Sequence, residues 1–320
     1  MAESAGRALG GIISKFKTLK NVGYRTFTKL YESGVVPILN YGCEVWGFVE
    51  HNCSDKIQNK AMRYFLGVHK FAPTAAVKGD MGWLPLKYKR YLSILRFWNR
   101  LNKMTNERLS KRILLFMKSK NYCNSWCHNV KRLSIILNME EVYNENQLFD
   151  ISDCEIKFIE IMSTEWKNSM ALKPKLRTYA LFKDSIKTEQ YVKNNISRSK
   201  RSIFAQFRLG ILPLMIETGR FKNVKDEVSG MFRKMKIEER LCKLCGMNLV
   251  EDELHFLLDC KIYDSLRKEL FKQISLNGSN EFLFASKIQT FTHLINEYWK
   301  YTINYIYDAW NLRKTLLYNI

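Results

Sequence analysis

The sequence predicts a mainly α-helical protein, and three observations support this: few turn residues, an ordinary core composition and helical periodicity. The 320 residues include only 5 Pro and 15 Gly, too few for the many turns of an all-β sandwich. Hydrophobic residues make up 46% of the chain and aromatic residues 13%, which is enough for a sizeable core. A chain of this length can form two or three compact units, at about 100–200 residues per domain.

The clearest periodicity lies in residues 86–104. Apolar and aromatic side chains recur there at steps of three and four, the pattern of an amphipathic helix: Tyr88, Tyr91, Leu92, Leu95 and Trp98. Basic side chains follow the same steps on another face, which we call the basic stripe: Lys89, Arg96, Arg100 and Lys103. The stripe is either an ordinary solvated helix surface or a phosphate-binding surface.

The chain divides by composition into four expected segments. A basic helical unit over residues 1–120 is followed by a helical connector over 121–195. A basic segment with a cysteine–histidine cluster is expected over 196–275, and aromatic-rich C-terminal helices over 276–320.

Local signals place helix boundaries within the first segment. Pro37 fits the first turn of a helix, so we expect a break between two helices near Gly34. Residues 54–67 are expected to form another helix, with Ser54 as its N-cap.

The charge indicates a polyanionic partner. The net charge is +21 and the pI about 9.6. Residues 51–120 hold 16 Lys/Arg against 3 Asp/Glu, whereas residues 251–320 hold 8 against 9. Nucleic acid is the expected partner, with an anionic membrane surface as the alternative. A second basic segment adds four candidate nucleic-acid contacts: Arg198, Lys200, Arg201 and Arg208.

Cysteine usage depends on the compartment. The sequence shows no secretory signal peptide and no apolar stretch of about 18 residues that could span a membrane. We therefore expect an intracellular protein, in the nucleus or the cytoplasm. In that setting the eight cysteines are better explained as metal ligands or core residues than as disulfides. The isolated Cys43, Cys53 and Cys154 are expected in the core.

The strongest local signal is a predicted structural zinc site at Cys242, Cys245, His255 and Cys260. Its C-x2-C and H-x4-C spacings suit one zinc ion in a closed tetrahedron, and Gly246 follows where a positive φ is often needed. The acidic residues 251–253 suit the N-terminus of a helix that carries His255 and ends around Leu270. A chance grouping of unrelated residues is the alternative.

A weaker cluster consists of Cys123, Cys127 and His128, and the sequence leaves open whether it binds metal. Sequence motifs of common catalytic sites are absent: there is no Asp-Asp dipeptide, P-loop, nucleophile elbow or H-E-x-x-H. We therefore expect no catalytic residues and no cofactor besides the zinc ion.

Several blocks resemble a known family. Residues 35–47, VVPILNYGCEVWG, look like the P-x-L-x-Y-G-x-E-x-W stretch that follows the palm in reverse transcriptases of non-LTR, LINE-type retrotransposons. Residues 57–67, IQNKAMRYFLG, are similar to that family's Q-x-x-x-x-R-x-x-L-G helix. Its C-terminal zinc-binding segment is resembled by the blocks at 207–210, 217–220, 239–242, 251–256 and 260–263.

The resemblance covers roughly residues 5–110 and 200–270. It implies a thumb-like helical unit, a connector and a zinc knuckle that hold template RNA and target DNA for the polymerase. The sequence departs from the family because it begins after the palm and lacks the Pro-Asp endonuclease motif of some relatives. Polymerase or nuclease activity is therefore not expected of this polypeptide alone.

The expected function is zinc-containing, non-catalytic binding of RNA and/or DNA, with the polymerase part of a retrotransposon protein as a further partner. The first alternative is a helical protein–protein interaction module with a structural zinc knuckle. The second is an enzyme whose site the sequence does not reveal.

Overall fold

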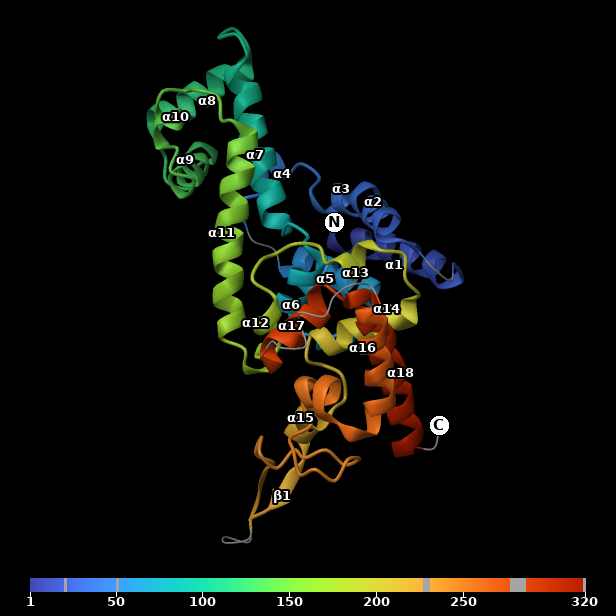
Figure 1. Ribbon diagram of the computed structural model, residues 1–320. Helices are drawn as coiled ribbons and strands as arrows, with labels where there is room; N and C mark the ends of the chain where they lie inside the picture. The colour runs from blue at the N-terminus through green and yellow to red at the C-terminus, as the bar shows by residue number, and fades with distance from the viewer. Residues whose placement is uncertain (20–21, 50–51, 227–230, 277–285, 319–320) are drawn as a thin grey trace. The chain divides into compact units, whose positions relative to one another are not determined.

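A computed structural model describes residues 1–19, 22–49, 52–226, 231–276 and 286–318. Within these ranges the chain is mainly helical, and its two short strands form one antiparallel hairpin (Figure 1). The predicted fold class is therefore confirmed. None of the helices in these ranges combines the length and the hydropathy that a membrane span requires. Part of the predicted C-terminal segment, residues 277–285, lies outside the described residues.

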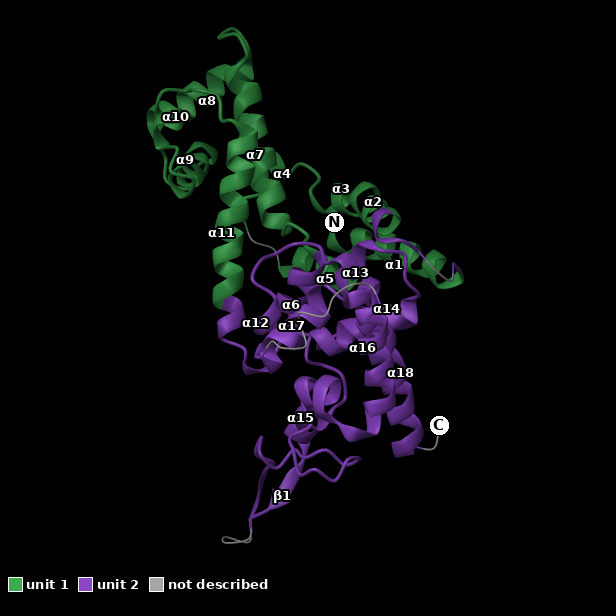
Figure 2. Ribbon diagram, in the orientation of Figure 1, with its two compact units in different colours: residues 1–18, 26–61, 82–168 green, residues 19–25, 62–81, 169–320 purple. Residues whose placement is uncertain are grey.

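The chain forms two compact units (Figure 2). Unit 1 comprises residues 1–18, 26–61 and 82–168, and unit 2 comprises residues 19–25, 62–81 and 169–320. Helices α5 (Asn52–Leu66) and α11 (Ile151–Ala171) each contribute residues to both units. The four consecutive segments expected from the sequence therefore do not correspond one to one with the two units.

The remaining helices of unit 1 are α1 Ala2–Thr18, most of α2 Tyr24–Gly34, α3 Val36–Leu39, α4 Cys43–Trp46, α7 Leu86–Asn102, α8 Leu109–Lys120, α9 Trp126–Ile136 and α10 Glu140–Asn144. The α-helices of unit 2 are α6 Thr74–Met81, α12 Tyr179–Phe182, α13 Gln190–Lys193, α14 Arg198–Arg208, α15 Met215–Thr218, α16 Asp264–Ser275, α17 Lys287–Asn296 and α18 Trp299–Tyr318. Its other elements are the 3₁₀ helices η1 Pro174–Leu176, η2 Gly219–Phe221 and η4 Lys261–Tyr263, the π-helix η3 His255–Asp259, and strands β1 Asn223–Lys225 and β2 Phe232–Lys234.

Two of the three predicted helix boundaries are confirmed. α2 ends at Gly34, and Pro37 lies in the first turn of α3, where the N–H that proline lacks has no partner to lose. The third is wrong, because α5 includes Asn52 and Ser54 is buried inside the helix instead of capping it.

The core of unit 1 is centred on α7. The predicted apolar face is confirmed by the buried side chains of Tyr88, Leu92, Leu95 and Trp98. The Trp98 ring stacks on Trp126 of α9 and on Tyr143 of α10, with centroid distances of 6.3 and 5.0 Å. Three helices therefore share one aromatic core.

Helix α8 reverses the usual amphipathic arrangement. On its inward side, Lys118 Nζ donates to the carbonyls of Tyr143 and Asn144 at 2.6 and 2.9 Å. These carbonyls lie at the C-terminal end of α10, where a cation is stabilising. Apolar side chains lie exposed beside Arg112 and Lys120 on the outward side, with 69%, 48% and 56% of the respective residue surfaces exposed at Leu109, Ile113 and Phe116.

The core of unit 2 contains a fully buried ion pair. Arg208 on α14 contacts Asp80 on α6 through two parallel bonds, Nε to Oδ2 at 3.1 Å and Nη2 to Oδ1 at 3.2 Å. The hydroxyls of Tyr179 and Tyr191 donate to the same carboxylate at 2.8 and 2.7 Å. Burial opposes the charge of Arg208, but attraction to Asp80 and Glu189 outweighs it and raises the pKa of Arg208.

Replacing Arg208 by methionine (Arg208→Met) should lower the free energy of unfolding by about 3–5 kcal/mol, because Asp80 would remain buried without its cation. Urea unfolding followed by circular dichroism measures the change. The matched control is Lys193→Met on an exposed position of the same unit, which should stay within about 0.5 kcal/mol of the wild type. Equal effects of both substitutions would contradict the importance of the pair.

Candidate metal centre

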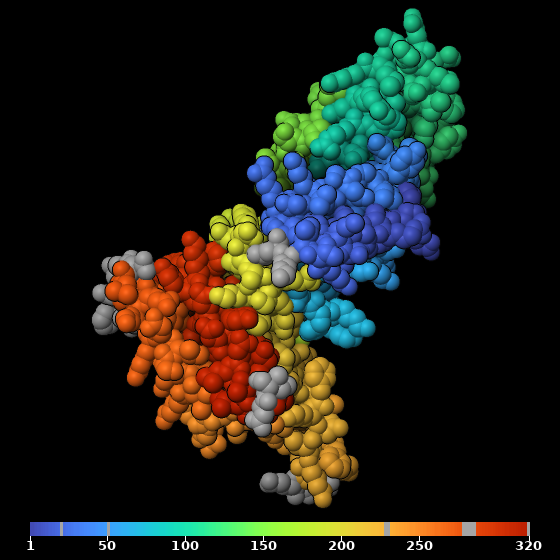
Figure 3. Space-filling model, turned by 90° about the vertical axis from the view of Figure 1, so that its right-hand side faces the viewer, coloured from blue at the N-terminus to red at the C-terminus, as the bar shows by residue number. Residues whose placement is uncertain are grey.

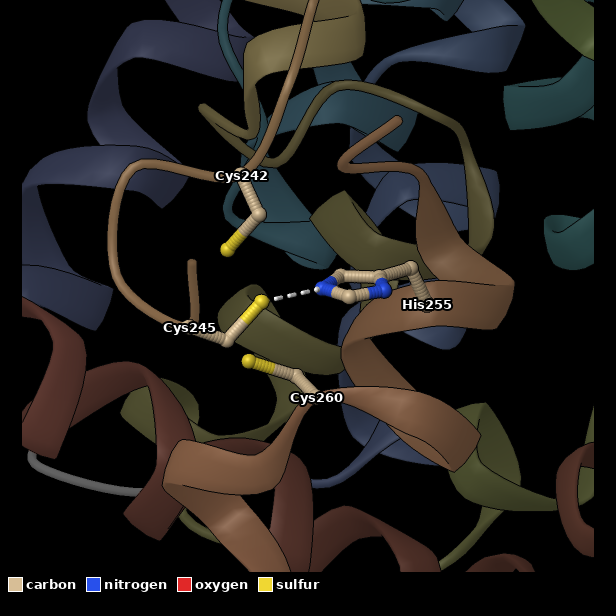
Figure 4. A group of neighbouring side chains, drawn as sticks. All are labelled: Cys242, Cys245, His255 and Cys260. Atoms are coloured by element: carbon tan, nitrogen blue, oxygen red, sulfur yellow. Dashed lines mark hydrogen bonds between the residues drawn. The ribbon is translucent and has the colours of Figure 1, made fainter. Parts of the chain in front are cut away.

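The four predicted metal ligands, Cys242, Cys245, His255 and Cys260, come together in unit 2 (Figure 4). Their three sulfur atoms and one ring nitrogen all lie within 4.8 Å of one another. Cys245 Sγ lies 3.5 Å from Nε2 of His255. Cys245 is half-buried and the other three are buried. The four side chains point at a common centre, and the group could hold one metal ion.

The first two ligands lie on a tight turn. Leu241 and Val250 form an antiparallel bridge, and the Cys242 N–H donates to the Leu249 carbonyl at 2.9 Å. Within the turn, Gly246 adopts φ +63°, a left-handed conformation that glycine takes without steric strain. The turn therefore aims both sulfur atoms at the same point.

The other two ligands lie at the ends of one turn of π-helix, η3. The Cys260 N–H donates to the His255 carbonyl at 2.9 Å, a step one residue longer than in an α-helix. Cys260 then takes φ −61° and ψ 119°, so the chain leaves the helix there. The predicted single helix through to Leu270 is therefore wrong. Its interruption brings the Cys260 sulfur toward the other ligands, and α16 begins only at Asp264.

The neighbouring thiols of Cys242 and Cys260 shift each other's pKa in opposite directions. The hydrogen bond with Cys260 lowers the pKa of Cys242 to about 3, and His255 and nearby backbone N–H groups act in the same direction. The same hydrogen bond, together with burial, raises the pKa of Cys260. Because metals bind the thiolate form of cysteine, binding of an ion at this centre would release the protons of the ligand thiols.

Side chains that the sequence analysis did not single out support this loop. Arg267 on α16 donates to the carbonyls of Leu257 and Cys260 at 2.9 and 2.8 Å. Tyr305 on α18 donates to the Phe256 carbonyl at 3.0 Å. Carbonyls of the π-helical turn thus find partners on two other helices. Nothing in the sequence distinguishes this arginine and this tyrosine from other helix residues.

The acidic run before His255 is only partly as expected. Asp252 accepts a hydrogen bond from the His255 N–H at 2.8 Å, which fits the predicted helix N-terminus. Glu251 and Glu253 are both buried, so the run is not a solvated surface. Glu251 pairs with Nη2 of Arg313 at 2.9 Å. Burial raises the pKa of Glu251 to about 7, although Arg313 opposes the shift.

The second cysteine cluster does not assemble. The Cys127 thiol is buried and donates to the Leu114 carbonyl at 3.8 Å, and burial raises its pKa to about 11. Cys123 is exposed. Within the described part of the chain, no second group of three His, Cys, Asp or Glu side chains gathers its ligand atoms as the metal centre does.

The three isolated cysteines were expected in the core. Cys43 and Cys154 are buried, as predicted, whereas Cys53 is exposed, so the prediction is wrong for Cys53. This residue lies in the first turn of α5.

The basic stripe is only partly available to a polyanion. Arg96, Arg100 and Lys103 are exposed. Lys89 is half-buried, and its Nζ lies 3.1 Å from Oε1 of Glu32. This neighbour neutralises the charge of Lys89, so three of the four stripe residues remain as candidate phosphate contacts.

The second basic segment keeps only two of its four candidate residues at the surface. Arg201 and Arg208 are buried, and their assignment to a nucleic-acid surface is wrong. Arg201 Nε donates to the Phe65 carbonyl at 3.0 Å, and Arg208 binds Asp80. The two arginines are seven residues apart, so they lie on one face of α14, and that face is the buried one. Arg198 and Lys200 stay half-exposed.

Comparison of the chain with protein-family models, with curated proteins and with solved structures finds no match.

Substitution of one ligand should remove the metal. Purified protein should carry one metal ion per chain, and Cys260→Ser should carry none, because a hydroxyl replaces a buried thiolate ligand. Elemental analysis after gel filtration measures the content. Cys154→Ser, which alters an equally buried cysteine of unit 1, is the control and should retain the ion. A well-folded wild type without metal would contradict the assignment.

Proposed function

We propose that the protein binds nucleic acid through phosphate contacts and carries one structural zinc ion. The observation that carries the binding proposal is the exposed cluster of Arg96, Arg100 and Lys103 on one helix of a chain with a net charge of +21. RNA and DNA share the phosphate backbone, so the proposal covers both. Three free thiol ligands also suit a reducing, intracellular compartment.

Zinc is the ion that best suits the donor set. Three sulfur atoms and one imidazole nitrogen fill a tetrahedron and leave no open position. With Zn–S distances of about 2.3 Å, the sulfur atoms would be about 3.8 Å apart. Ligand atoms that already lie within 4.8 Å of one another therefore need to approach by no more than about 1 Å. The ion would be structural: it would fix the C-x2-C turn against the π-helical turn.

The geometry of α7 supports phosphate binding. Arg96 and Arg100 line an open hollow of about 210 Å³ together with Ser93, Phe97 and Glu44. The Arg100 guanidinium lies 4.7 Å above the Phe97 ring centroid, a contact that orients its fork of N–H donors. Guanidinium groups bind phosphate through paired hydrogen bonds. The hollow leaves room for an anionic group beside the two arginines, whose charge exceeds that of the single carboxylate of Glu44.

The resemblance to LINE-type reverse transcriptases supports the same proposal. It implies that the region around α7 lies near a primer–template duplex and that the cysteine-rich segment helps to hold the nucleic acid. We propose a binding role beside a polymerase rather than catalysis, because the sequence contains no Asp-Asp dipeptide, whereas polymerases need paired carboxylates to hold two metal ions.

The stripe can be tested by its salt dependence. Alanine at Arg96, Arg100 and Lys103 together should lower the log–log slope of affinity against salt by about two to three units, since each phosphate that is no longer neutralised removes roughly 0.7–0.9 from the slope. Fluorescence anisotropy with labelled RNA and duplex DNA at several salt concentrations measures the slope.

Lys89→Ala is the matched control, because Lys89 lies on the same helix but is paired with Glu32. It should leave the slope nearly unchanged. If the triple variant keeps the wild-type affinity and slope, the stripe is not the binding surface.

A second candidate function, protein–protein interaction, is favoured by the reversed helix α8. Its exposed Leu109, Ile113 and Phe116 follow the i, i+4, i+7 spacing by which helices dock on partners. Residues 108–139 contain seven Lys/Arg and no Asp/Glu. A second copy of the chain would bring like charges together, so the partner that fits is a different protein with an acidic amphipathic helix.

This alternative predicts binding of a synthetic helix with leucines at that spacing and glutamates on its flanks. Changing Ile113 and Phe116 together to serine should weaken the complex more than tenfold, given about 1.5–3 kcal/mol for each buried apolar side chain. Ile156→Ser, an exposed isoleucine on α11, is the control. Fluorescence anisotropy measures both, and equal binding of a lysine-flanked helix would rule out the acidic partner.

A further inference from the structure

The β1–β2 hairpin has one face that is fully exposed. The pairs Asn223–Lys234 and Lys225–Phe232 lie directly opposite each other, so their side chains share a face. The Met235 N–H also donates to the Lys222 carbonyl at 3.1 Å. Beyond this bond the ladder ends, with Phe221 in the 3₁₀ helix η2 on one side and Lys236 after β2 on the other. We call the four paired residues, together with Phe221 and Lys236 at the base of the hairpin, the hairpin face: Phe221, Asn223, Lys225, Phe232, Lys234 and Lys236. All six are exposed, and the hairpin, gold in Figure 3, stands out from the body of unit 2.

On the opposite side of the hairpin, Arg233 binds the two nearby carboxylates, Asp226 and Glu239. Arg233 Nε lies 2.9 Å from Asp226 Oδ2, and its two Nη atoms contact both oxygens of Glu239, Nη1 at 2.9 Å and Nη2 at 2.5 Å. The contact with Arg233 lowers the pKa of Glu239 to about 2, so this carboxylate stays ionised and paired. Among the described residues, no carboxylate forms an ion pair with a lysine of the hairpin face. That face therefore carries three lysines, two aromatic rings and Asn223, and no carboxylate.

The pattern on the hairpin face matches single-stranded nucleic acid. The Phe221 and Phe232 residues are 74% and 75% exposed, and Phe232 has Lys225 directly across the ladder. Residues two apart along a strand are separated by about 6.6 Å, so a base can stack on a ring while a neighbouring phosphate reaches a lysine. Duplex DNA keeps its bases stacked on each other and offers no free base to the two rings.

An anionic membrane is the competing ligand for exposed aromatic and basic side chains. Segments that lie on membranes separate an apolar side from a charged side. On the hairpin face lysines lie beside the rings instead, for example Lys225 and Lys234 beside Phe232, so no continuous apolar area is available to enter a bilayer. This arrangement favours a ligand that carries aromatic and anionic groups close together.

We propose that the hairpin face is a binding site for single-stranded nucleic acid, in which Phe221 and Phe232 stack on bases and Lys225, Lys234 and Lys236 contact phosphates. This inference rests on the proposed function and adds a second surface to it, with a different ligand form.

The experiment compares three variants with the wild type in anisotropy titrations with a short labelled oligothymidine and with duplex DNA. Changing Phe221 and Phe232 together to serine should weaken oligothymidine binding about fivefold or more for each ring, with an unchanged salt slope. Changing Lys225, Lys234 and Lys236 together to glutamine should lower that slope by about two units, at roughly 0.7 per phosphate on a single strand. Met231→Ser is the control, since Met231 is 72% exposed but lies on the opposite side of the hairpin.

The outcomes separate this inference from the proposed function. Selective loss of oligothymidine binding in the phenylalanine variant, with duplex binding retained, supports the hairpin site. Wild-type affinity in that variant, while the α7 triple variant loses binding, overturns the hairpin site and leaves the proposed function standing. A wild type that binds no nucleic acid overturns both. Binding to phosphatidylserine vesicles that the phenylalanine variant loses, without oligothymidine binding, assigns the face to membranes and overturns the inference.

Discussion

The buried ion pair between Asp80 and Arg208 is the interaction on which the packing of unit 2 depends. A carboxylate in a protein interior is destabilising unless its oxygens are satisfied, and Asp80 receives two bonds from Arg208 and one each from Tyr179 and Tyr191. These four residues come from α14, α6, α12 and α13. Helices α12, α13 and α14 are therefore each fixed to α6 by hydrogen bonds to Asp80 in the protein interior, where water cannot take their place.

The metal centre follows the same logic at a second place in unit 2. The π-helical turn would expose unpaired carbonyls, but Arg267 and Tyr305 reach in from α16 and α18 to bind them. A metal ion would join this turn to the C-x2-C turn from the other side. The ligand loop would therefore be held from two sides. The metal ion would bind its sulfur and nitrogen atoms, and the side chains of α16 and α18 bind its carbonyls.

Local chemistry made part of this structure predictable from the sequence. The ligand spacing identified all four residues of the metal centre, and the three- and four-residue period identified the buried face of α7. Both depend on residues close together in the chain. The break at Cys260 was not predictable, because the sequence of that segment is compatible with an ordinary helix and only the geometry of the ligand group shows why it ends.

The errors on the basic segment have a different cause. Arg201 and Arg208 look like surface residues in a run of Arg, Ser and Lys, and a buried arginine is rare unless paired. Their burial depends on Asp80, Glu189 and the Phe65 carbonyl, which lie up to 136 residues away. Helix α8 is a similar case. From the sequence, Lys118 would be expected in solvent, and only the carbonyls of α10 that it binds explain why it points inward. Whether such a basic side chain is buried depends on partners far away in the chain, and the local composition does not reveal these partners.

These partners also decide where the net charge of +21 acts. A buried pair such as Asp80–Arg208 or Glu251–Arg313 removes one acid and one base from the surface together, so it leaves the excess positive charge outside. Arg233 likewise takes up Asp226 and Glu239 on one side of the hairpin and leaves the lysines of the other side unopposed. The positive potential is therefore set less by where lysine and arginine are frequent than by where the carboxylates are already paired. A polyanion would be attracted to surfaces whose basic residues have no neighbouring carboxylate. Lys89 of the stripe, which is paired with Glu32, would contribute little to its binding.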